Sequence, residues 1–301
     1  MKSVIEINNL TKIYDNKKVI NDLSFDIPEY SICGFLGPNG SGKTTTFKLL
    51  TGLIKNNGGS IKILDEAISL DNHSKYLRYL QDVPEFYNYM STYEYLKFIC
   101  HLNNLDNIDS LIDEVLELVG LINVKKKRID TFSRGMKQRL GIASNIIAKP
   151  KILLLDEPIS ALDPIGRKEI FTLLNKLKGK MTILFSTHII DDIEKVCDRI
   201  IVINNGKKLI DGKLQDIKNN YFTNFIEIVF IRKKDLNIFI SNAKFKYTIN
   251  DLTLKIEESA NIQDNIFKIL SDNKINISKF NVFTPSLEDI FIKEVLKWNN
   301  L

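Results

Sequence analysis

Residues 37–45 read Gly37-Pro38-Asn39-Gly40-Ser41-Gly42-Lys43-Thr44-Thr45, and this stretch decides the fold of the 301-residue chain. It fits the pattern G-x-x-x-x-G-K-[ST], which binds phosphate where a buried strand meets a helix. The flanking residues supply that context, because 31–36 are apolar enough for a buried strand and 43–52 have apolar residues at helical spacing. The stretch therefore predicts a bound nucleoside triphosphate.

The residue types in this stretch suit phosphate binding for physical reasons. Glycine lets the backbone curl so that several N–H groups and a helix N-terminus point at one anion. We expect Lys43 to neutralise the β- and γ-phosphates, Thr44 to offer its hydroxyl to the Mg²⁺ that bridges them, and Thr45 to hydrogen-bond the α-phosphate. A chance glycine-rich turn is the alternative, because short motif matches carry a false-positive risk.

A second motif is the apolar strand Ile152-Leu153-Leu154-Leu155, which ends in the adjacent carboxylates Asp156 and Glu157. Both carboxylates are expected at the carboxyl edge of the sheet, where open α/β sheets bind ligands. We expect Asp156 to join the Mg²⁺ shell and Glu157 to polarise the water that attacks the γ-phosphate. For this segment taken alone, a solvated acidic pair at a strand end is the alternative.

Composition bounds the class of protein. A chain of 301 residues with 44% apolar residues is long and apolar enough for one large domain and a smaller one. The net charge of +5 singles out neither nucleic acid nor anionic lipid as a partner. Cys33, Cys100 and Cys197 fit no metal-ligand spacing and are expected to be buried in a reducing compartment. The sequence shows no signal-peptide pattern and no run of the ~18 apolar residues that span a bilayer, so we expect a cytoplasmic chain.

The hydrophobic pattern divides the chain into two domains, 1–214 and 215–301. The first carries both motifs, a helical insertion at about 85–148, and a helix at 167–178 that joins two buried strands. The second predicts a small α+β accessory domain with a strand at 225–231, a helix at 262–270, a strand at 275–283 and a helix at 287–298.

The stretch Thr131-Phe132-Ser133-Arg134-Gly135-Met136-Lys137-Gln138-Arg139 resembles the signature segment of the nucleotide-binding subunits of ATP-binding-cassette (ABC) transporters. In that family the segment, usually Leu-Ser-Gly-Gly-Gln, grips the γ-phosphate of ATP held by the opposite protomer. Ser133 and Gly135 match residue by residue, whereas Phe132, Arg134 and Met136 depart from the usual form. The resemblance implies an α/β fold, a P-loop NTPase cassette with a mixed sheet and a helical signature subdomain.

Further segments follow the family's order. Ser160-Ala161-Leu162-Asp163 resembles the loop that contacts the second protomer of the dimer. Ser186-Thr187-His188 resembles the switch-histidine segment, which implies that His188 contacts the γ-phosphate and holds the attack geometry. Tyr14 matches the aromatic residue that stacks on adenine, with an ordinary packing tyrosine as the alternative.

The family's glutamine loop corresponds to Tyr79-Leu80-Gln81-Asp82-Val83-Pro84. Alignment on Pro84 places Asp82, not Gln81, at the position that contacts Mg²⁺, and the choice between the two residues stays open. A carboxylate is compatible with Mg²⁺, which prefers oxygen ligands. The residues that follow resemble the surface that meets the membrane subunit, with a packed aromatic cluster as the alternative. They are Phe86, Tyr87, Tyr89 and Met90.

The resemblance implies an ATPase that uses ATP and Mg²⁺ and forms a homodimer or heterodimer at the cytoplasmic face of the cell membrane. Its partner there is a separate polytopic permease, and no nucleic acid is expected. The stretch Pro285-Ser286-Leu287-Glu288-Asp289-Ile290-Phe291 resembles the end of the accessory domain in subunits that serve drug and lantibiotic exporters. This favours export of a small molecule, antibiotic, peptide or lipid-like substrate.

Two other functions are the alternatives. A soluble cassette ATPase that acts on ribosomes or nucleic acid usually carries two cassettes or a long coiled coil, whereas this chain has one phosphate loop and no sustained heptads. A nucleotide-regulated binding module without turnover requires a damaged site, whereas Lys43, Asp156, Glu157 and His188 are all present.

Overall fold

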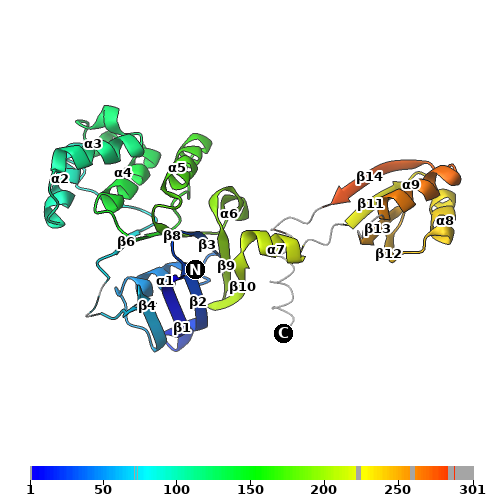
Figure 1. Ribbon diagram of the computed structural model, residues 1–301, viewed down its shortest axis with the longest axis horizontal. Coiled ribbons are helices and arrows are strands. Elements are labelled where there is room, and N and C mark those ends of the chain that lie inside the picture. Colours follow the sequence, from blue (N-terminus) through cyan, green and yellow to red (C-terminus); the bar gives the residue numbers. More distant parts are fainter. Residues whose placement is uncertain are drawn as a thin grey trace. The chain divides into compact units, whose positions relative to one another are not determined.

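The computed structural model describes residues 2–70, 72, 74–221, 225–257, 262–283 and 288 (Figure 1). The chain separates into two compact units, Met1–Leu214 and Gln215–Leu301. Each unit has its own apolar core, and each is described by itself. Across the described ranges, no helix combines the length and the apolar character that a membrane span requires.

Two sheets build the first unit. The antiparallel sheet contains, in spatial order, β2 (Lys17–Pro28), β1 (Ser3–Tyr14), β4 (Gly58–Ile63) and β5 (Glu66–Ala67). The six-stranded sheet contains β10 (Lys207–Lys213), β9 (Arg199–Asn204), β3 (Ile32–Leu36), β8 (Thr182–Thr187), β7 (Ile152–Leu155) and β6 (Leu77–Leu80). In this sheet β9, β3, β8, β7 and β6 are parallel, and β10 runs antiparallel to β9. The strands β3, β8 and β7 therefore end side by side at one edge.

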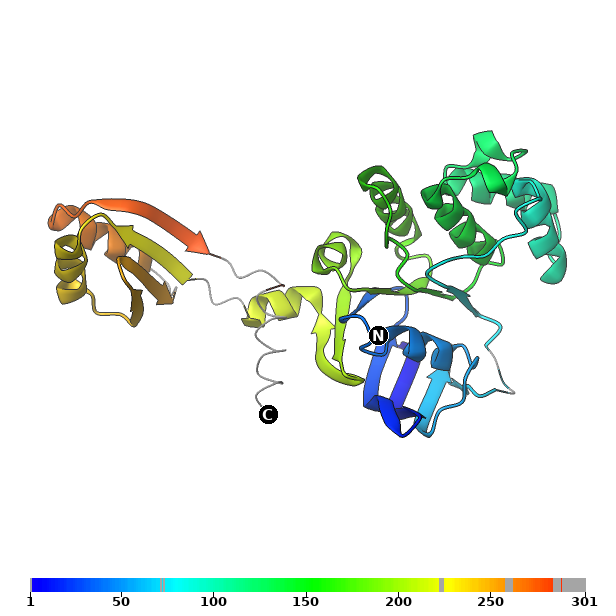
Figure 2. The same cartoon turned by 180° about the vertical axis from the view of Figure 1, so that it is seen from behind.

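Helices cover both faces of the six-stranded sheet (Figures 1 and 2). Helix α1 (Lys43–Leu50) packs between the two sheets, where Phe47, Leu49 and Leu50 join residues of both sheets in one core. Helices α5 (Pro164–Leu177) and α6 (Ile190–Val196) pack against each other, and α6 also contacts β3 and β8. The helical part contains α2 (Thr92–Leu102), α3 (Ile108–Leu118), η1 (Ile122–Val124), η2 (Ile129–Thr131) and α4 (Arg134–Ile146).

A chain of aromatic rings joins the layers of the first unit. The ring centroids of Phe25 and Phe35 are 5.6 Å apart, and Phe35 stacks on Phe47 at 5.9 Å. Phe47 then meets the edge of Tyr79 on β6 at 6.2 Å. Phe35 and Phe47 are fully buried. The helix that begins at Lys43 is therefore anchored by its packing against both sheets.

Two differences from the sequence patterns have local causes. Helix α5 begins at Pro164 rather than at 167, because Asp163 Oδ1 accepts a hydrogen bond from the Gly166 N–H at 2.8 Å and proline suits the first position of a helix. Strand β6, which the patterns did not assign, has four residues that pair with β7, and so short a run carries little periodic signal. The expected helix at 287–298 lies outside the described residues except for 288.

The second unit forms an α+β sandwich. After α7 (Leu214–Tyr221), its elements are β11 (Phe225–Phe230), α8 (Lys233–Asn242), β12 (Tyr247–Asn250), β13 (Thr253–Glu257), α9 (Ile262–Asp272) and β14 (Ile277–Phe283). The sheet order is β12-β13-β11-β14, and neighbouring strands are antiparallel. This β-α-β-β-α-β succession is the ferredoxin-like arrangement. The predicted fold class, an α/β cassette with a helical part plus a small α+β unit, is confirmed.

The burial of Phe47 predicts a stability defect. We expect Phe47→Ala to lower the free energy of unfolding by about 3–5 kcal/mol, because it removes a fully buried ring and leaves a cavity. Leu53→Ala, at an exposed position just beyond the same helix, is the matched control and should stay within about 0.5 kcal/mol of the unmodified protein. Denaturant unfolding measures both, and equal losses would contradict the anchoring role of Phe47.

Candidate functional site

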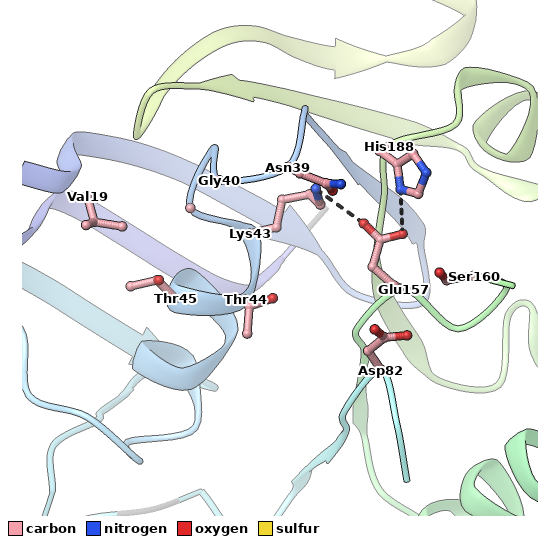
Figure 3. Close-up of a pocket in the computed structure, with 11 residues that line it drawn as sticks. Val19, Asn39, Gly40, Lys43, Thr44, Thr45, Asp82, Glu157, Ser160 and His188 are labelled. Carbon is pink, nitrogen blue, oxygen red and sulfur yellow. Dashed lines mark hydrogen bonds and ion pairs between the residues drawn. The ribbon is translucent and has the colours of Figure 1, made fainter.

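The two predicted motifs meet at the edge where the parallel strands end. The loop at 37–42 joins β3 to α1, Glu157 lies just beyond β7, and His188 lies just beyond β8. Because β8 lies between β3 and β7, these residues converge on a pocket of about 350 Å³ (Figure 3). The pocket is lined by Val19, Asn39, Gly40, Gly42, Lys43, Thr44, Thr45, Asp82, Glu157, Ser160 and His188.

The loop at 37–42 has the backbone geometry of an anion cradle. Gly40 and Gly42 have φ angles of 79° and 108°, in a region that favours glycine. Helix α1 begins at Lys43, so its N-terminus and the partial positive charge there face the pocket. Among the described residues, the buried Ser41 Oγ has no hydrogen-bond partner. The donors present therefore fit a phosphate group.

A turn between β9 and β10 supports this loop from behind. The Gly206 N–H donates to Ser41 O at 3.0 Å, and the Asn21 N–H donates to Gly206 O at 2.9 Å. Gly206 has a φ of 74°, and a Cβ there would lie 2.3 Å from Val19 O. No sequence pattern predicted this support. The Asn205-Gly206 dipeptide signals a turn, but nothing in the sequence says what the turn touches.

Lys43, Glu157 and His188 form a connected group (Figure 3). Lys43 is only 5% exposed, and its Nζ donates to Gly37 O at 2.8 Å and to Pro38 O at 3.2 Å. The same Nζ lies 3.3 Å from Glu157 Oε1, and Glu157 Oε2 lies 3.0 Å from His188 Nδ1. Glu157 has a φ of 45°, in the left-handed region that residues with a side chain adopt less readily than glycine.

Asp156, a predicted metal ligand, is not among the residues that line the pocket and is 2% exposed. Its Oδ1 accepts from Ser186 Oγ at 2.5 Å, and its Oδ2 accepts from Tyr79 OH at 3.2 Å. Burial raises the pKa of Tyr79, and the charge of Asp156 raises it further, so the phenol stays protonated and donates. Tyr79 and Ser186 thus orient Asp156, a role that the sequence analysis did not assign to either residue.

Of the two candidates in the glutamine loop, Asp82 lines the pocket. Gln81 instead donates from Nε2 to Val83 O at 2.9 Å, within its own loop. Burial raises the pKa of Asp82, and the charges of Asp156 and Glu157 act in the same direction. Arg134, whose guanidinium lies 3.9 Å from Asp82 Oδ1, opposes this shift.

Of the predicted nucleotide contacts, Tyr14, Ser133 and Gly135 do not line this pocket, and neither do Gly37, Pro38 and Ser41 of the loop at 37–42. Tyr14 is 43% exposed, and Lys12 Nζ lies 4.7 Å from the centroid of its ring. Ser133 is the N-cap of α4, where its Oγ accepts from the Met136 N–H at 3.3 Å. Roles in adenine stacking and in a second protomer's site stay predictions for these residues.

The aromatic residues after the glutamine loop are both packed and exposed. Phe86 meets Tyr95 with ring centroids 5.2 Å apart, and Tyr87 meets Phe98 at 5.8 Å. Tyr87 and Tyr89 nevertheless remain exposed. The cluster therefore has features of both alternatives stated above, a packed cluster and a contact surface.

These features define a class of protein: an ATPase with a phosphate loop on a parallel sheet and a carboxylate held beside its lysine. Comparison with known proteins identifies the family. Residues 20–160 match the family model described as ABC transporter, and residues 212–295 match the C-terminal domain of DrrA1-3-like ATP-binding proteins.

Relatives and solved structures agree with these matches. The chain is 37% identical over 299 residues to the uncharacterized ABC transporter ATP-binding protein YxlF of Bacillus subtilis, covering 97% of this chain and 99% of that one. It is 34% identical over 306 residues to the bacitracin transport ATP-binding protein BcrA of Bacillus licheniformis, covering 97% of each. CbiO1 of Clostridium perfringens, part of the ABC transporter complex cbiONQ, superimposes with a TM-score of 0.66 at 26% identity, over 72% of this chain and 91% of that one.

The chain therefore belongs to the ATP-binding subunits of ABC transporters, which are ATPases. The predicted family and activity are confirmed. YxlF and BcrA are both named as transport ATP-binding proteins, and neither name points to the alternative of a soluble ATPase that acts on ribosomes or nucleic acid.

The support of the phosphate loop by Gly206 yields a binding prediction. We expect Gly206→Ala to weaken ATP binding by about tenfold or more, because the new Cβ clashes with Val19 O and a left-handed φ costs about 1–2 kcal/mol for alanine. Gly179→Ala is the matched control, since Gly179 has the same φ of 74° but a Cβ there would have nothing within 4 Å. Titration with a fluorescent ATP analogue measures both, and equal affinities would contradict the supporting role.

Proposed function

We propose that this chain powers export through a separate membrane permease, as one of two nucleotide-binding subunits at the cytoplasmic face of the membrane. The observation that carries its catalytic part is the convergence of Lys43, Glu157 and His188 in one pocket, with contacts of 3.3 Å and 3.0 Å. The bacitracin transport relative and the DrrA1-3-like domain favour export of a small molecule, antibiotic, peptide or lipid-like substrate.

The proposed hydrolysis uses the residues of the pocket in distinct roles. Phosphate oxygens of ATP give Lys43 new partners, and this releases Glu157 Oε1 to accept a proton from the attacking water. His188 holds the other oxygen, Oε2, and keeps the carboxylate pointed into the pocket. Thr45 and the backbone of 37–42 fix the position of the remaining phosphates.

Mg²⁺ is part of the same proposal. Thr44 and Asp82 line the pocket, and Asp156, which precedes the pocket residue Glu157 in the chain, has its carboxylate oriented by two hydrogen bonds. These are hydroxyl and carboxylate oxygens, which suit an ion that prefers a few protein oxygens together with substrate phosphates. Thr44, Asp82 and Asp156 would hold Mg²⁺, and the bound ion would supply positive charge against the phosphates of ATP.

The pairing of two subunits follows from residues outside the pocket. Ser133 and Gly135 start α4 and do not line the pocket of their own chain. We propose that they contact the ATP held by the second subunit, which is another copy or a close relative. Tyr14 stacks on adenine, and the exposed rings of Tyr87 and Tyr89 meet the permease.

Replacement of the proposed base tests this function. We expect Glu157→Gln to lower kcat by about 10²–10⁴-fold, because a general base is lost, while ATP binding is kept. The variant should then hold ATP in a dimer on size-exclusion chromatography with Mg²⁺. Tagged and purified from detergent-solubilised membranes, it should co-purify with a polytopic permease that mass spectrometry identifies. Lys43→Ala is the control. It lacks the ammonium that binds phosphate, so it should form no ATP-dependent dimer, and ATP should not change how much permease co-purifies with it.

Two results contradict the proposal. A Glu157→Gln protein that stays monomeric and hydrolyses ATP at the normal rate removes Glu157 as the base. Recovery of ribosomal proteins or nucleic acid without any permease favours the soluble ATPase instead.

The placement of Asp82 yields a separate prediction about Mg²⁺. We expect Asp82→Asn to raise severalfold the Mg²⁺ concentration needed for half-maximal ATPase activity, because an amide oxygen is a weaker ligand than a carboxylate. Gln81→Ala is the matched control, since the Gln81 side chain bonds to its own loop. A Mg²⁺ titration of the steady-state rate distinguishes the two residues, and the opposite pattern would assign the contact to Gln81.

A further inference from the structure

An ion pair joins α5 to α6 next to the site and has no part in the mechanism above. Arg167 Nη2 lies 2.6 Å from Asp192 Oδ1, and Asp192 is only 1% exposed. A buried ion pair is weak evidence for stability, because desolvation of the two charges offsets much of their attraction. Its short contact nevertheless fixes the position of the two helices where they meet.

Thr187 connects Asp192 of the ion pair to the backbone on both sides of His188. Thr187 Oγ1 donates to the second carboxylate oxygen of Asp192 at 3.4 Å and accepts from the Ile189 N–H at 3.0 Å. Thr187 is 2% exposed, so this hydroxyl has a fixed environment. The residues on both sides of His188 are therefore held by one hydroxyl group, which Asp192 in turn holds.

Arg167 of the ion pair is connected to the loop at 160–163 through Asp163. The Arg167 N–H donates to Asp163 O at 2.9 Å, and Asp163 also caps the helix through the Gly166 N–H. Arg167 thus lies one helical turn after Asp163, the last residue of that loop, so Arg167 moves when the loop moves. The other end of the loop is tied to the proposed base, because the Ser160 N–H donates to Glu157 O at 3.0 Å.

These contacts close a ring. It runs from Glu157 through the loop at 160–163 to Arg167, across the ion pair to Asp192, through Thr187 to His188, and back to Glu157 over the 3.0 Å contact. We propose that Arg167 and Asp192 are positioning residues that set the geometry of His188 against Glu157 and couple it to the loop at 160–163. This inference rests on the proposed function, in which Glu157 and His188 act on ATP.

Coupling through the ring gives a specific kinetic signature. We expect Asp192→Asn to lower kcat between roughly tenfold and a hundredfold, because a displacement of about 1 Å in a catalytic group costs on the order of 10²-fold. The KM for ATP should change by less than about twofold, because the phosphate loop keeps its own backbone geometry and its support by Gly206, although Gly37 and Lys43 each contact a residue of the ring. Arg167→Met should show the same fall in kcat at a nearly constant KM. The double variant Arg167→Met/Asp192→Asn should lose no more of its kcat than either single variant.

The matched control is Asp211→Asn. Asp211 lies 2.7 Å from Arg199 and 2.9 Å from Lys208 in a partly shielded ion-pair cluster of the first unit, outside the ring. Both Asp192→Asn and Asp211→Asn should lower the melting temperature, but only Asp192→Asn should lower kcat. Equal kcat in the two folded variants, or losses that add in the double variant Arg167→Met/Asp192→Asn, overturns the proposal.

A second variant covers the case in which Asp192→Asn does not fold. Thr187→Val keeps the side-chain volume and the ion pair but removes the hydroxyl that joins Asp192 to the backbone beside His188. It should show the same fall in kcat at nearly constant KM, and a normal kcat overturns the proposal.

The full-length unmodified protein and Glu157→Gln are assayed alongside. If the unmodified protein does not hydrolyse ATP, or if Glu157→Gln is fully active, the proposed function fails and the ring loses its basis. If the unmodified protein and Glu157→Gln behave as expected while Asp192→Asn and Thr187→Val keep a normal kcat, only the positioning role fails.

Discussion

The parallel pairing of β8 between β3 and β7 is the constraint on which the site depends. Leu36 pairs with Thr187, so β3 and β8 end together, and β7 ends two residues earlier in the register, where Leu155 pairs with Phe185. The Gly37 N–H continues the pairing of β3 with β8 by one residue, because it donates to Thr187 O at 3.3 Å where the phosphate loop begins. A shift in any of these registers moves Lys43, Glu157 and His188 apart, because each belongs to a different strand end. The chemistry of the pocket is thus a property of the sheet.

Much of the fold and part of the site could be predicted from the sequence. The phosphate loop and the carboxylates after β7 are contiguous motifs whose spacing carries their geometry, and His188 follows from a short match beyond a buried strand. The contacts that hold these motifs join residues far apart in the chain, such as Tyr79 to Asp156 and Gly206 to Ser41. No local pattern records such pairs, because each partner alone is compatible with an ordinary turn or strand.

The residues of the pocket all belong to the first unit. The second unit has a ferredoxin-like order of elements and its own core, in which Ile228 of β11 packs with Phe239 of α8 and Ile266 of α9. The pocket and the second unit therefore rest on separate cores. A substitution in one core acts first on the unit that contains it.

The buried ammonium of the phosphate loop has acceptors within the protein itself. The ammonium of Lys43 is held by two carbonyl groups of its own loop and by Glu157. A buried charge without partners costs several kcal/mol, so a loop that lacked these contacts would hold any spent nucleotide tightly. When phosphate contacts are lost, the Lys43 ammonium can return to these acceptors of its own chain, so no buried charge is left without a partner.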